Sequence, residues 1–289
     1  MIGYYYCSLS TFLNIVKNKQ IYLSDPLKMN DKLEIRWYLE RLKNERIGLE
    51  ELEFSEEEYL FNMIKMRSGI DFALDELLEI LNSEGQNSVY ICCFSKESDI
   101  LSQWRTYADN GRGISVGFNL EKLARADNLL VNEVIYTNDV VYGGVESDVE
   151  CVADTIGTVI DYYNITTKEK QLEVFLHELI PDLVKYKNPA FSEEKEVRII
   201  YCEDLKFEKI VDSYGAFTNN WETVELEHDF RMKGDDDITE FVKMDFDPDA
   251  IEEICIGPKN LLTERDVKNI VEKMLGVEVN VIKSKASYR

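Results

Sequence analysis

Hydrophobic and polar positions at the start of the chain predict a strand, a helix and a second strand. Residues 4–7 form a short extended run, and residues 21–23 form another that ends at Asp25-Pro26. Between them, apolar side chains recur at the spacing of one helical face: Leu9, Phe12, Leu13 and Val16. The chain is therefore expected to begin with two strands joined by a short helix.

The pattern becomes helical and strongly acidic after residue 31. Up to residue 82, apolar positions follow a helical period among many carboxylates. Ser55 followed by Glu58 is typical of the first turn of a helix, because the two side chains can bond the free amides there. We predict a helical insert at 35–85.

Three further segments have the length and composition of strands. Residues 89–94 are continuously apolar, as expected for a strand buried on both faces. Residues 114–118 form a second strand, which follows a helix that Ser98 is expected to cap. The stretch 196–201 alternates between apolar and polar positions, which indicates a strand with two different faces.

The end of the chain has the clearest pattern. Residues 251–256 and 277–282 read as strands, and a helix that Thr263 caps lies between them, so the two strands are expected to pair in parallel. Region 151–186 is helical. We predict an α+β fold, with a mixed sheet core, helical insertions and a C-terminal βαβ unit, in a single domain of residues 1–289.

Charge narrows the classes of partner. The chain has 33 Lys and Arg against 56 Asp and Glu, and its formal net charge is −23. Such a chain repels phosphate lattices and anionic lipids, so we expect no bulk nucleic-acid binding and no membrane binding. A local basic pocket could still bind one nucleotide. The six cysteines form no CxxC pair, and neither a signal-peptide pattern nor a membrane-length apolar run is present, which favours a reducing cytoplasm.

Two local motifs look chemical but lack the context that their chemistry needs. Residues 113–117 spell GxSxG, yet Ser115 follows a predicted helix and continues into a strand, the reverse of a nucleophile elbow. Asp245, Asp247 and Asp249 resemble the start of a calcium loop, but the glycine and the glutamate that the loop requires later are missing. We predict no metal site.

Glu194, Glu196 and Arg198 form the most informative group. In an extended segment their side chains project to one side. A neighbouring carboxylate raises the pKa of a partly buried acid while a guanidinium lowers it, and such opposing effects are typical of functional sites. A charged strand face with an exposed ion pair, worth about 0–1 kcal/mol, explains the same pattern. The spacing alone favours this second interpretation, and the first stays open.

Several short segments, spread over the whole chain, lie in a familiar order. They are residues 4–8, 23–26, 30–34, 93–95, 104–108, 111–118, 194–198, 256–258 and 288–289. Together they resemble the bacterial domain-of-unknown-function family 2971. Lys32 departs from the family pattern, because the Asn-Asp motif commonly continues with proline, and this affects only the local turn. The family has no securely established activity, so the resemblance by itself implies no reaction.

The same layout is similar, more distantly, to the ADP-ribosyltransferase-like group, in which residues of three strands surround NAD. This resemblance implies one residue from each of three pairs: Tyr4 or Tyr6, Ser95 or Ser115, and Glu194 or Glu196.

The resemblance also implies roles for these side chains. Glu196, with Glu194 as the alternative, would bond a ribose hydroxyl and stabilise the positive charge that develops when the nicotinamide bond breaks. Tyr6 would orient nicotinamide. Arg198 or Arg105 would present a planar fork of donors to the pyrophosphate.

The remaining candidates have simpler explanations beside the functional one. Asn30 and Asp31, with Glu34, would line the same cleft, or the first two simply cap a helix. Tyr4 and Ser95 are further NAD-binding candidates, although Tyr4 could instead pack one face of the sheet.

Three functions follow as alternatives. The first is ADP-ribosyl transfer from NAD, or NAD hydrolysis. The second is a non-catalytic ligand-sensing or protein-interaction module, for example in defence against phage, that binds a nucleotide-like ligand without turnover. The third is metal-dependent cleavage of phosphodiesters by an acid-rich site. The sequence does not decide whether the protein is an enzyme.

Overall fold

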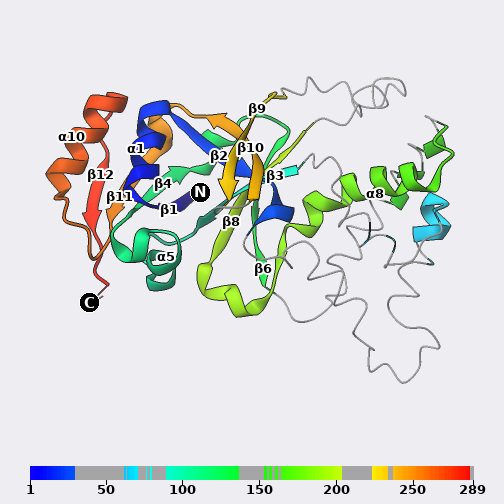
Figure 1. The fold of residues 1–289 in the computed structure, drawn as a ribbon, viewed down its shortest axis with the longest axis horizontal. Helices are drawn as coiled ribbons and strands as arrows, with labels where there is room; N and C mark the ends of the chain where they lie inside the picture. The colour runs from blue at the N-terminus through cyan, green and yellow to red at the C-terminus, as the bar shows by residue number, and fades with distance from the viewer. Residues whose placement is uncertain are drawn as a thin grey trace.

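The computed structural model describes residues 1–29, 62, 64–70, 76, 79, 89–136, 153–154, 156–157, 160–161, 164–203, 223–233 and 237–286 (Figure 1). The strands in this part are β1 (Ile2–Cys7), β2 (Gln20–Ser24), β3 (Val89–Ser95), β4 (Ile114–Asn119), β5 (Leu129–Glu133), β6 (Ile135–Tyr136), β7 (Tyr186–Lys187), β8 (Glu196–Cys202), β9 (Glu227–Lys233), β10 (Asp237–Asp245), β11 (Ile251–Ile256) and β12 (Asn280–Lys283). The α-helices are α1 (Leu9–Asn18), α5 (Leu101–Thr106), α6 (Leu120–Leu123), α8 (Lys168–Leu183) and α10 (Glu264–Leu275). Short 3₁₀ helices are η1 (Pro26–Lys28), η2 (Asp109–Gly111), η3 (Pro189–Glu194) and η4 (Pro248–Ala250).

A mixed sheet of 10 strands forms the centre of the described structure. Eight strands follow one another in the order β12-β11-β4-β1-β3-β2-β10-β9, while β8 pairs with β3 and β5 pairs with β8. Strands β11 and β12 are parallel, and the other pairs in this sheet are antiparallel. The predicted α+β class with a mixed sheet core is confirmed.

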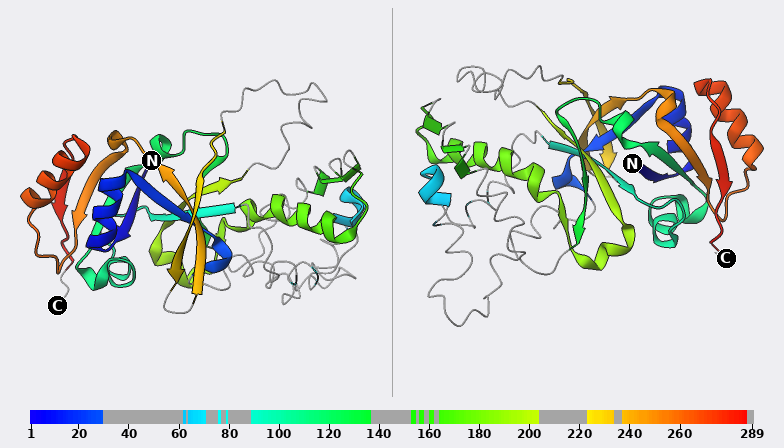
Figure 2. Two further views of the ribbon diagram at one scale, coloured as in Figure 1. Left: turned by 45° about the horizontal axis from the view of Figure 1, so that its top comes forward. Right: turned by 180° about the vertical axis from the view of Figure 1, so that it is seen from behind.

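Strand β3 is the branch point of this sheet. One of its edges pairs with β8 from Val89 to Ser95. Its other edge is divided, because β1 pairs with it at Ser95 and β2 pairs with it at Ile91. Two groups of strands therefore spread from β3, as the two views of Figure 2 show. Strands β1 and β8, which carry Tyr4 and Glu196, both pair directly with β3, whereas β6 and β7 form a separate two-stranded sheet.

The main hydrophobic core lies on the face of the sheet covered by α1 and α10. Helix α1 begins after Ser8, whose hydroxyl accepts from the amide of Thr11. Its buried residues are Phe12, Ile15 and Val16. The predicted stripe was partly wrong, because Leu13 is exposed and Ile15 occupies the inward position in its place. Figure 1 shows α1 and α10 at the same end of the molecule.

The C-terminal βαβ unit is confirmed. The Thr263 side chain accepts from the amide of Asp266, whose carboxylate accepts from the Thr263 amide, so a capping box begins α10. Gly276 ends the helix with φ 73°, a left-handed conformation that glycine adopts without steric cost. The following strand begins at Asn280, three residues later than the pattern predicted, and pairs in parallel with β11.

A second hydrophobic cluster lies where α8 packs near β3 and β8. Its fully buried members include Phe175, Leu183 and Val89. Helix α8 lies within the region 151–186 that was predicted as helical. Helix α5 begins later than predicted: its N-cap is Ile100, with no capping side chain, so the assignment of Ser98 as cap is wrong.

Some expectations concern residues outside the described part. Asn30 and Asp31 are among them, as is most of the insert predicted at 35–85, in which the described residues 62, 64–68, 76 and 79 are helical. Among the helices described, none has the length and apolar character needed to span a bilayer.

Packing of α10 against the sheet gives a first prediction. Val271 is fully buried, whereas Met274 on the same helix is 50% exposed. We expect Val271→Ala to lower the free energy of unfolding by about 1.5–3 kcal/mol, because it removes buried methyl groups and leaves a cavity. Met274→Ala is the control and should change it by less than about 0.5 kcal/mol. Urea unfolding followed by circular dichroism measures both, and equal losses would contradict this packing.

Candidate functional site

Strand register places three predicted site residues side by side. Tyr4 of β1 lies opposite Ser95 of β3, and Ser95 lies opposite Glu196 of β8. Directly opposed residues of neighbouring strands point to the same face of a sheet. The three side chains, which are far apart in the sequence, therefore project from one face, opposite to the core of α1 and α10.

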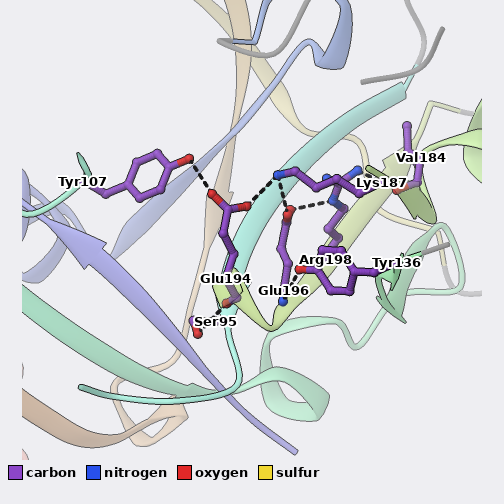
Figure 3. Close-up of polar contacts among 8 residues, drawn as sticks. All are labelled: Ser95, Tyr107, Tyr136, Val184, Lys187, Glu194, Glu196 and Arg198. Carbon is purple, nitrogen blue, oxygen red and sulfur yellow. Dashed lines mark hydrogen bonds and ion pairs between the residues drawn. The ribbon is translucent and has the colours of Figure 1, made fainter. Parts of the chain in front are cut away.

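Glu196 is the centre of a buried ion cluster on this face (Figure 3). Its residue is 4% exposed, and its two carboxylate oxygens have different cationic partners. Arg198 Nε donates to Oε1 at 2.6 Å, and Lys187 Nζ donates to Oε2 at 2.8 Å. Arg198 is fully buried and also donates from Nη1 to the carbonyl of Val184 at 2.6 Å. The cluster thus joins β8, β7 and the end of α8.

The two cations keep Glu196 ionised. Burial alone would raise the pKa of this carboxyl group, because it disfavours the charged form. The Arg198 guanidinium and then the Lys187 ammonium outweigh burial and hold the pKa of Glu196 at about 2. An acid that stays ionised, is almost fully buried and has a cation bonded to each oxygen stabilises the local structure through these ion pairs.

Glu194 is the second carboxylate of the cluster and the more accessible one. It ends η3, where its carbonyl accepts from the Ser95 hydroxyl at 2.8 Å. Its Oε2 accepts from Lys187 Nζ at 2.7 Å, and its Oε1 accepts from the Tyr107 hydroxyl at 3.4 Å. The Glu194 side chain is 13% exposed, against 5% for Glu196. Figure 3 shows Tyr107 on the side of Glu194 away from Arg198.

Glu194 and Glu196 do lie close together, as predicted, but the extended geometry on which that prediction depended is not what brings them together. Glu194 belongs to a 3₁₀ turn and not to the strand, and Lys195, with φ 48°, separates it from Glu196. Lys187 joins the two carboxylates. The exposed ion pair that the spacing favoured is not what forms, because the Glu196 and Arg198 side chains are both buried.

Lys187 and Tyr136 are cluster residues that the sequence analysis missed. They lie opposite each other in the small parallel sheet of β6 and β7. Each of these strands has only two residues, which is too short for a hydrophobic period to predict it. The Tyr136 hydroxyl accepts from the amide of Glu196 at 2.8 Å. Burial raises the pKa of Tyr136 to about 12, so this hydroxyl stays protonated at neutral pH. The pairing of β6 with β7, together with the bond from the Val134 amide to the Glu196 carbonyl, holds these two side chains at the cluster.

Tyr6 is a structural residue in this conformation. It is 6% exposed, and its hydroxyl donates to the carbonyl of Glu97 and accepts from the amide of Ile100, both at 2.8 Å. Its ring packs edge-on against Trp104 at 4.8 Å between centroids. In this conformation the ring and the hydroxyl of Tyr6 both have partners inside the protein, so an NAD-contacting role for Tyr6 stays an expectation from the resemblance alone.

The other predicted ligand-contacting residues differ in how much of their surface is exposed. Arg198 has no exposed surface in this conformation, so the structure gives its expected role beside a pyrophosphate no support. Arg105 is exposed on α5, the helix that leads to Tyr107. Tyr4 is partly buried, and its hydroxyl donates to Glu253 at 3.4 Å.

The motifs set aside in the sequence have ordinary structural roles. Ser115 lies inside β4 and is fully buried, as predicted for a strand residue. The three aspartates of the calcium-like run contact different side chains: Asp245 accepts from Gln20, Asp247 pairs with Arg125, and Asp249 pairs with Lys122. Within the described ranges, no group of three or more His, Cys, Asp and Glu side chains could hold a metal ion.

The geometry defines what the cluster can do chemically. Two carboxylates and two cations balance in charge, so the group can stay ionised in the interior. Glu194 offers a carboxylate edge near the surface, held in place by Lys187, and Tyr107 beside it is 42% exposed. A carboxylate next to an aromatic hydroxyl can accept from sugar hydroxyls.

Comparisons with known proteins support one family over part of the chain. The family model described as "Protein of unknown function (DUF2971)" matches residues 103–199, about a third of the chain. The similarity to family 2971 is thus supported for this segment. Every residue of the cluster in Figure 3 except Ser95 lies within it. Neither the curated proteins nor the solved structures gave a significant match.

The buried cluster predicts a large effect of neutralising Glu196. We expect Glu196→Gln to lower the free energy of unfolding at pH 7 by about 3–5 kcal/mol, because it leaves buried cations without their counter-charge. Glu193→Gln, on the same segment but exposed, is the control and should change it by less than about 0.5 kcal/mol. Urea unfolding at constant pH measures the difference.

The same pair of variants gives the pH dependence. The folded-state pKa of Glu196 lies below its ordinary value of 4.5, so its ion pairs stabilise the fold fully above that pH and are lost as pH falls toward 2. The stability difference between wild type and Glu196→Gln should therefore shrink below about pH 4.5. A difference that stays constant down to the acid unfolding of the protein would show that Glu196 is not held ionised.

Proposed function

We propose that this protein binds a nucleotide such as NAD beside the ion cluster, on the face of the sheet opposite to α1 and α10. The observation that carries the proposal is the alignment of Tyr4, Ser95 and Glu196 on three neighbouring strands. The distant resemblance to the ADP-ribosyltransferase-like group requires one polar residue from each of three strands around the ligand. The register supports Tyr4 and Ser95 as the residues from the first two strands, and Glu196 anchors the third position, beside which Glu194 lies.

Glu194 is the carboxylate that meets the ligand in this proposal. Glu196 has both oxygens bonded to buried cations, whereas Glu194 has the more exposed side chain and a hydroxyl neighbour in Tyr107. A ribose hydroxyl can take the place of the long contact between Glu194 and Tyr107, which measures 3.4 Å. Glu196 then acts as a positioning residue, because it fixes Lys187, which in turn fixes Glu194.

A second predicted phosphate contact lies outside the cluster. Arg105 is exposed on α5, which packs against η3 and ends beside Tyr107. A guanidinium presents a planar fork of donors that matches a pyrophosphate. Because Arg198 has no exposed surface, Arg105 is the phosphate-binding candidate of this proposal.

The enzymatic version of this function is ADP-ribosyl transfer or NAD hydrolysis. The bond between nicotinamide and the ribose C1′ breaks, its electron pair leaves with nicotinamide, and an acceptor nucleophile or water forms the new bond to C1′. The ribose carries positive charge in the transition state, and a carboxylate held against its hydroxyls lowers the barrier. Glu194 is the residue placed to supply that charge.

A recognition module that binds the nucleotide without turnover is the second candidate, with defence against phage as one setting. The specific observation in its favour is that both carboxylates are already bonded to Lys187, an arrangement typical of a rigid site. The third candidate, metal-dependent phosphodiester cleavage, has no observation in its favour within the described residues.

Calorimetric titration with NAD tests the binding proposal. We expect the wild-type protein to bind NAD, and Glu194→Gln to weaken binding about 10- to 100-fold, since a hydrogen bond to a charged group is worth about 1.5–3 kcal/mol. Glu193→Gln, next to it but exposed, should bind as the wild type does. Thermal unfolding of both variants confirms that they are folded. Absence of binding, or equal binding by Glu194→Gln, would contradict the proposal.

Nicotinamide release separates the two candidate functions. An enzyme should release nicotinamide from NAD, alone or with cell extract, and Glu194→Gln should slow the reaction by about a hundred- to a thousand-fold. A recognition module should instead show a rise in melting temperature with NAD and no release, because a ligand that binds only the native form stabilises it.

A further inference from the structure

The hairpin of β9 and β10 carries an exposed hydrophobic surface far along the chain from the ion cluster. Phe230 is 64% exposed, Met232 is 59% exposed and Ile238 is 58% exposed. Met232 lies directly opposite Ile238, and Phe230 lies two residues away on the same face of β9. Isolated apolar residues are common on protein surfaces, but a contiguous group on one strand face is typical of a binding surface.

Strand β9 is also an edge of the sheet. In the part of the chain that the structure describes, it pairs with β10 on one side and with no strand on the other. Figure 2 shows the two strands, yellow and orange, side by side as a hairpin. A free edge can add a strand through main-chain hydrogen bonds, and proteins usually protect such edges. Seven residues of β9 are available for such pairing.

The charges on the other face of β9 form a self-complementary series. Glu227 and Asp229 occupy its first half, and Arg231 lies in its second half. If two copies of β9 pair antiparallel about Phe230, Asp229 of each copy faces Arg231 of the other. Opposite charges in directly facing positions stabilise a strand pair, and like charges destabilise it.

Neighbouring registers lose this match. Pairing centred on Asp229 or on Arg231 brings two identical charges face to face at the two-fold axis. Parallel pairing in register opposes every charge with its own copy. In the register centred on Phe230, both Asp229 side chains face an Arg231 of the other copy, and the two Phe230 rings come together. The sequence of the strand therefore fits one partner, one direction and one register.

We propose that two copies of this chain associate through their β9 edges, antiparallel and centred on Phe230, to form a sheet that continues across a two-fold axis. Such a contact uses the same surface on both copies, as closed dimers do. In this register Phe230 packs against Phe230 of the second copy at the axis, and Met232 faces His228 of the second copy, so part of the apolar surface of the hairpin is covered.

The present contacts of the charged residues are compatible with this pairing. Asp229 accepts from Lys243 at 2.7 Å and from the amide of Phe230 at 2.8 Å, and its side chain is still 47% exposed. Arg231 donates to the Ser24 hydroxyl at 2.7 Å and is exposed. The Arg231 guanidinium also lies over the ring of the buried Phe241, 5.4 Å from its centroid. Both charged groups are at the surface, so each can turn toward the second copy by a change of side-chain rotamer. Exposed pairs of this kind set register and partner choice more than affinity.

Sedimentation velocity over a concentration series, with the full chain, tests the proposal. The wild type should show a reversible dimer, and Phe230→Lys should shift it to monomer because two ammonium groups would meet at the axis. Leu261→Lys is the control: Leu261 is 96% exposed and lies outside the hairpin, so the dimer should persist. Circular dichroism and thermal unfolding establish that each variant is folded. A monomeric wild type, or a dimer that Phe230→Lys leaves unchanged, would overturn the proposal.

Charge exchange tests the register. Asp229→Arg and Arg231→Asp should each be monomeric, because each places like charges opposite one another. An equimolar mixture of these two variants should form a mixed dimer, since every arginine then faces an aspartate. The double variant D229R/R231D should likewise dimerise with itself. Failure of both the mixture and the double variant to dimerise would overturn the antiparallel register, whatever the result for Phe230→Lys.

Discussion

The buried side chains of Arg198 and Lys187 bond the carboxylate of Glu196, and the positions of the other polar groups in the cluster depend on that interaction. An ionised acid in the interior is tolerated only when cations and hydrogen bonds replace water around it. Arg198 comes from the same strand as Glu196, whereas Lys187 comes from β7 and also bonds Glu194. The Lys187 ammonium group is held by the buried Glu196 and in turn holds Glu194 near the surface. The ion pairs that stabilise the fold here therefore also position the candidate site.

The branching of the sheet at β3 brings the strands that carry Tyr4, Ser95 and Glu196 next to one another. Strands β1 and β2 share one edge of β3, while β8 takes the whole of the other. The side facing α1 and α10 is filled with apolar residues. The opposite side, next to Ser95, receives η3, and with it Glu194. A polar group between neighbouring strands, with a hydroxyl and a carboxylate near the surface, suits a ligand that carries hydroxyls, which is the chemical basis for the proposed nucleotide.

Much of this architecture could be predicted from the sequence because strands and helices bury residues at different periods. Alternation from 196 to 201 identified β8 and placed its acid and its guanidinium on one face. What could not be predicted is what these groups contact. Lys187, which bonds Glu196, lies in the two-residue strand β7, which pairs with the equally short β6, and no local signal marks strands so short. Burial was the other missing quantity: Arg198 and Tyr6 looked like ligand contacts by residue type, but both are enclosed by partners from distant segments.

The most direct test of this account is a carboxyl carbon NMR titration of the protein labelled at glutamate, with Glu194 and Glu196 assigned from their glutamine variants. The account predicts that the Glu196 signal stays at its ionised position below pH 4.5, toward a pKa of about 2, and that added NAD shifts the Glu194 signal more than the Glu196 signal. A Glu196 carboxyl group that titrates near 4.5, or a larger NAD-induced shift at Glu196 than at Glu194, would contradict it.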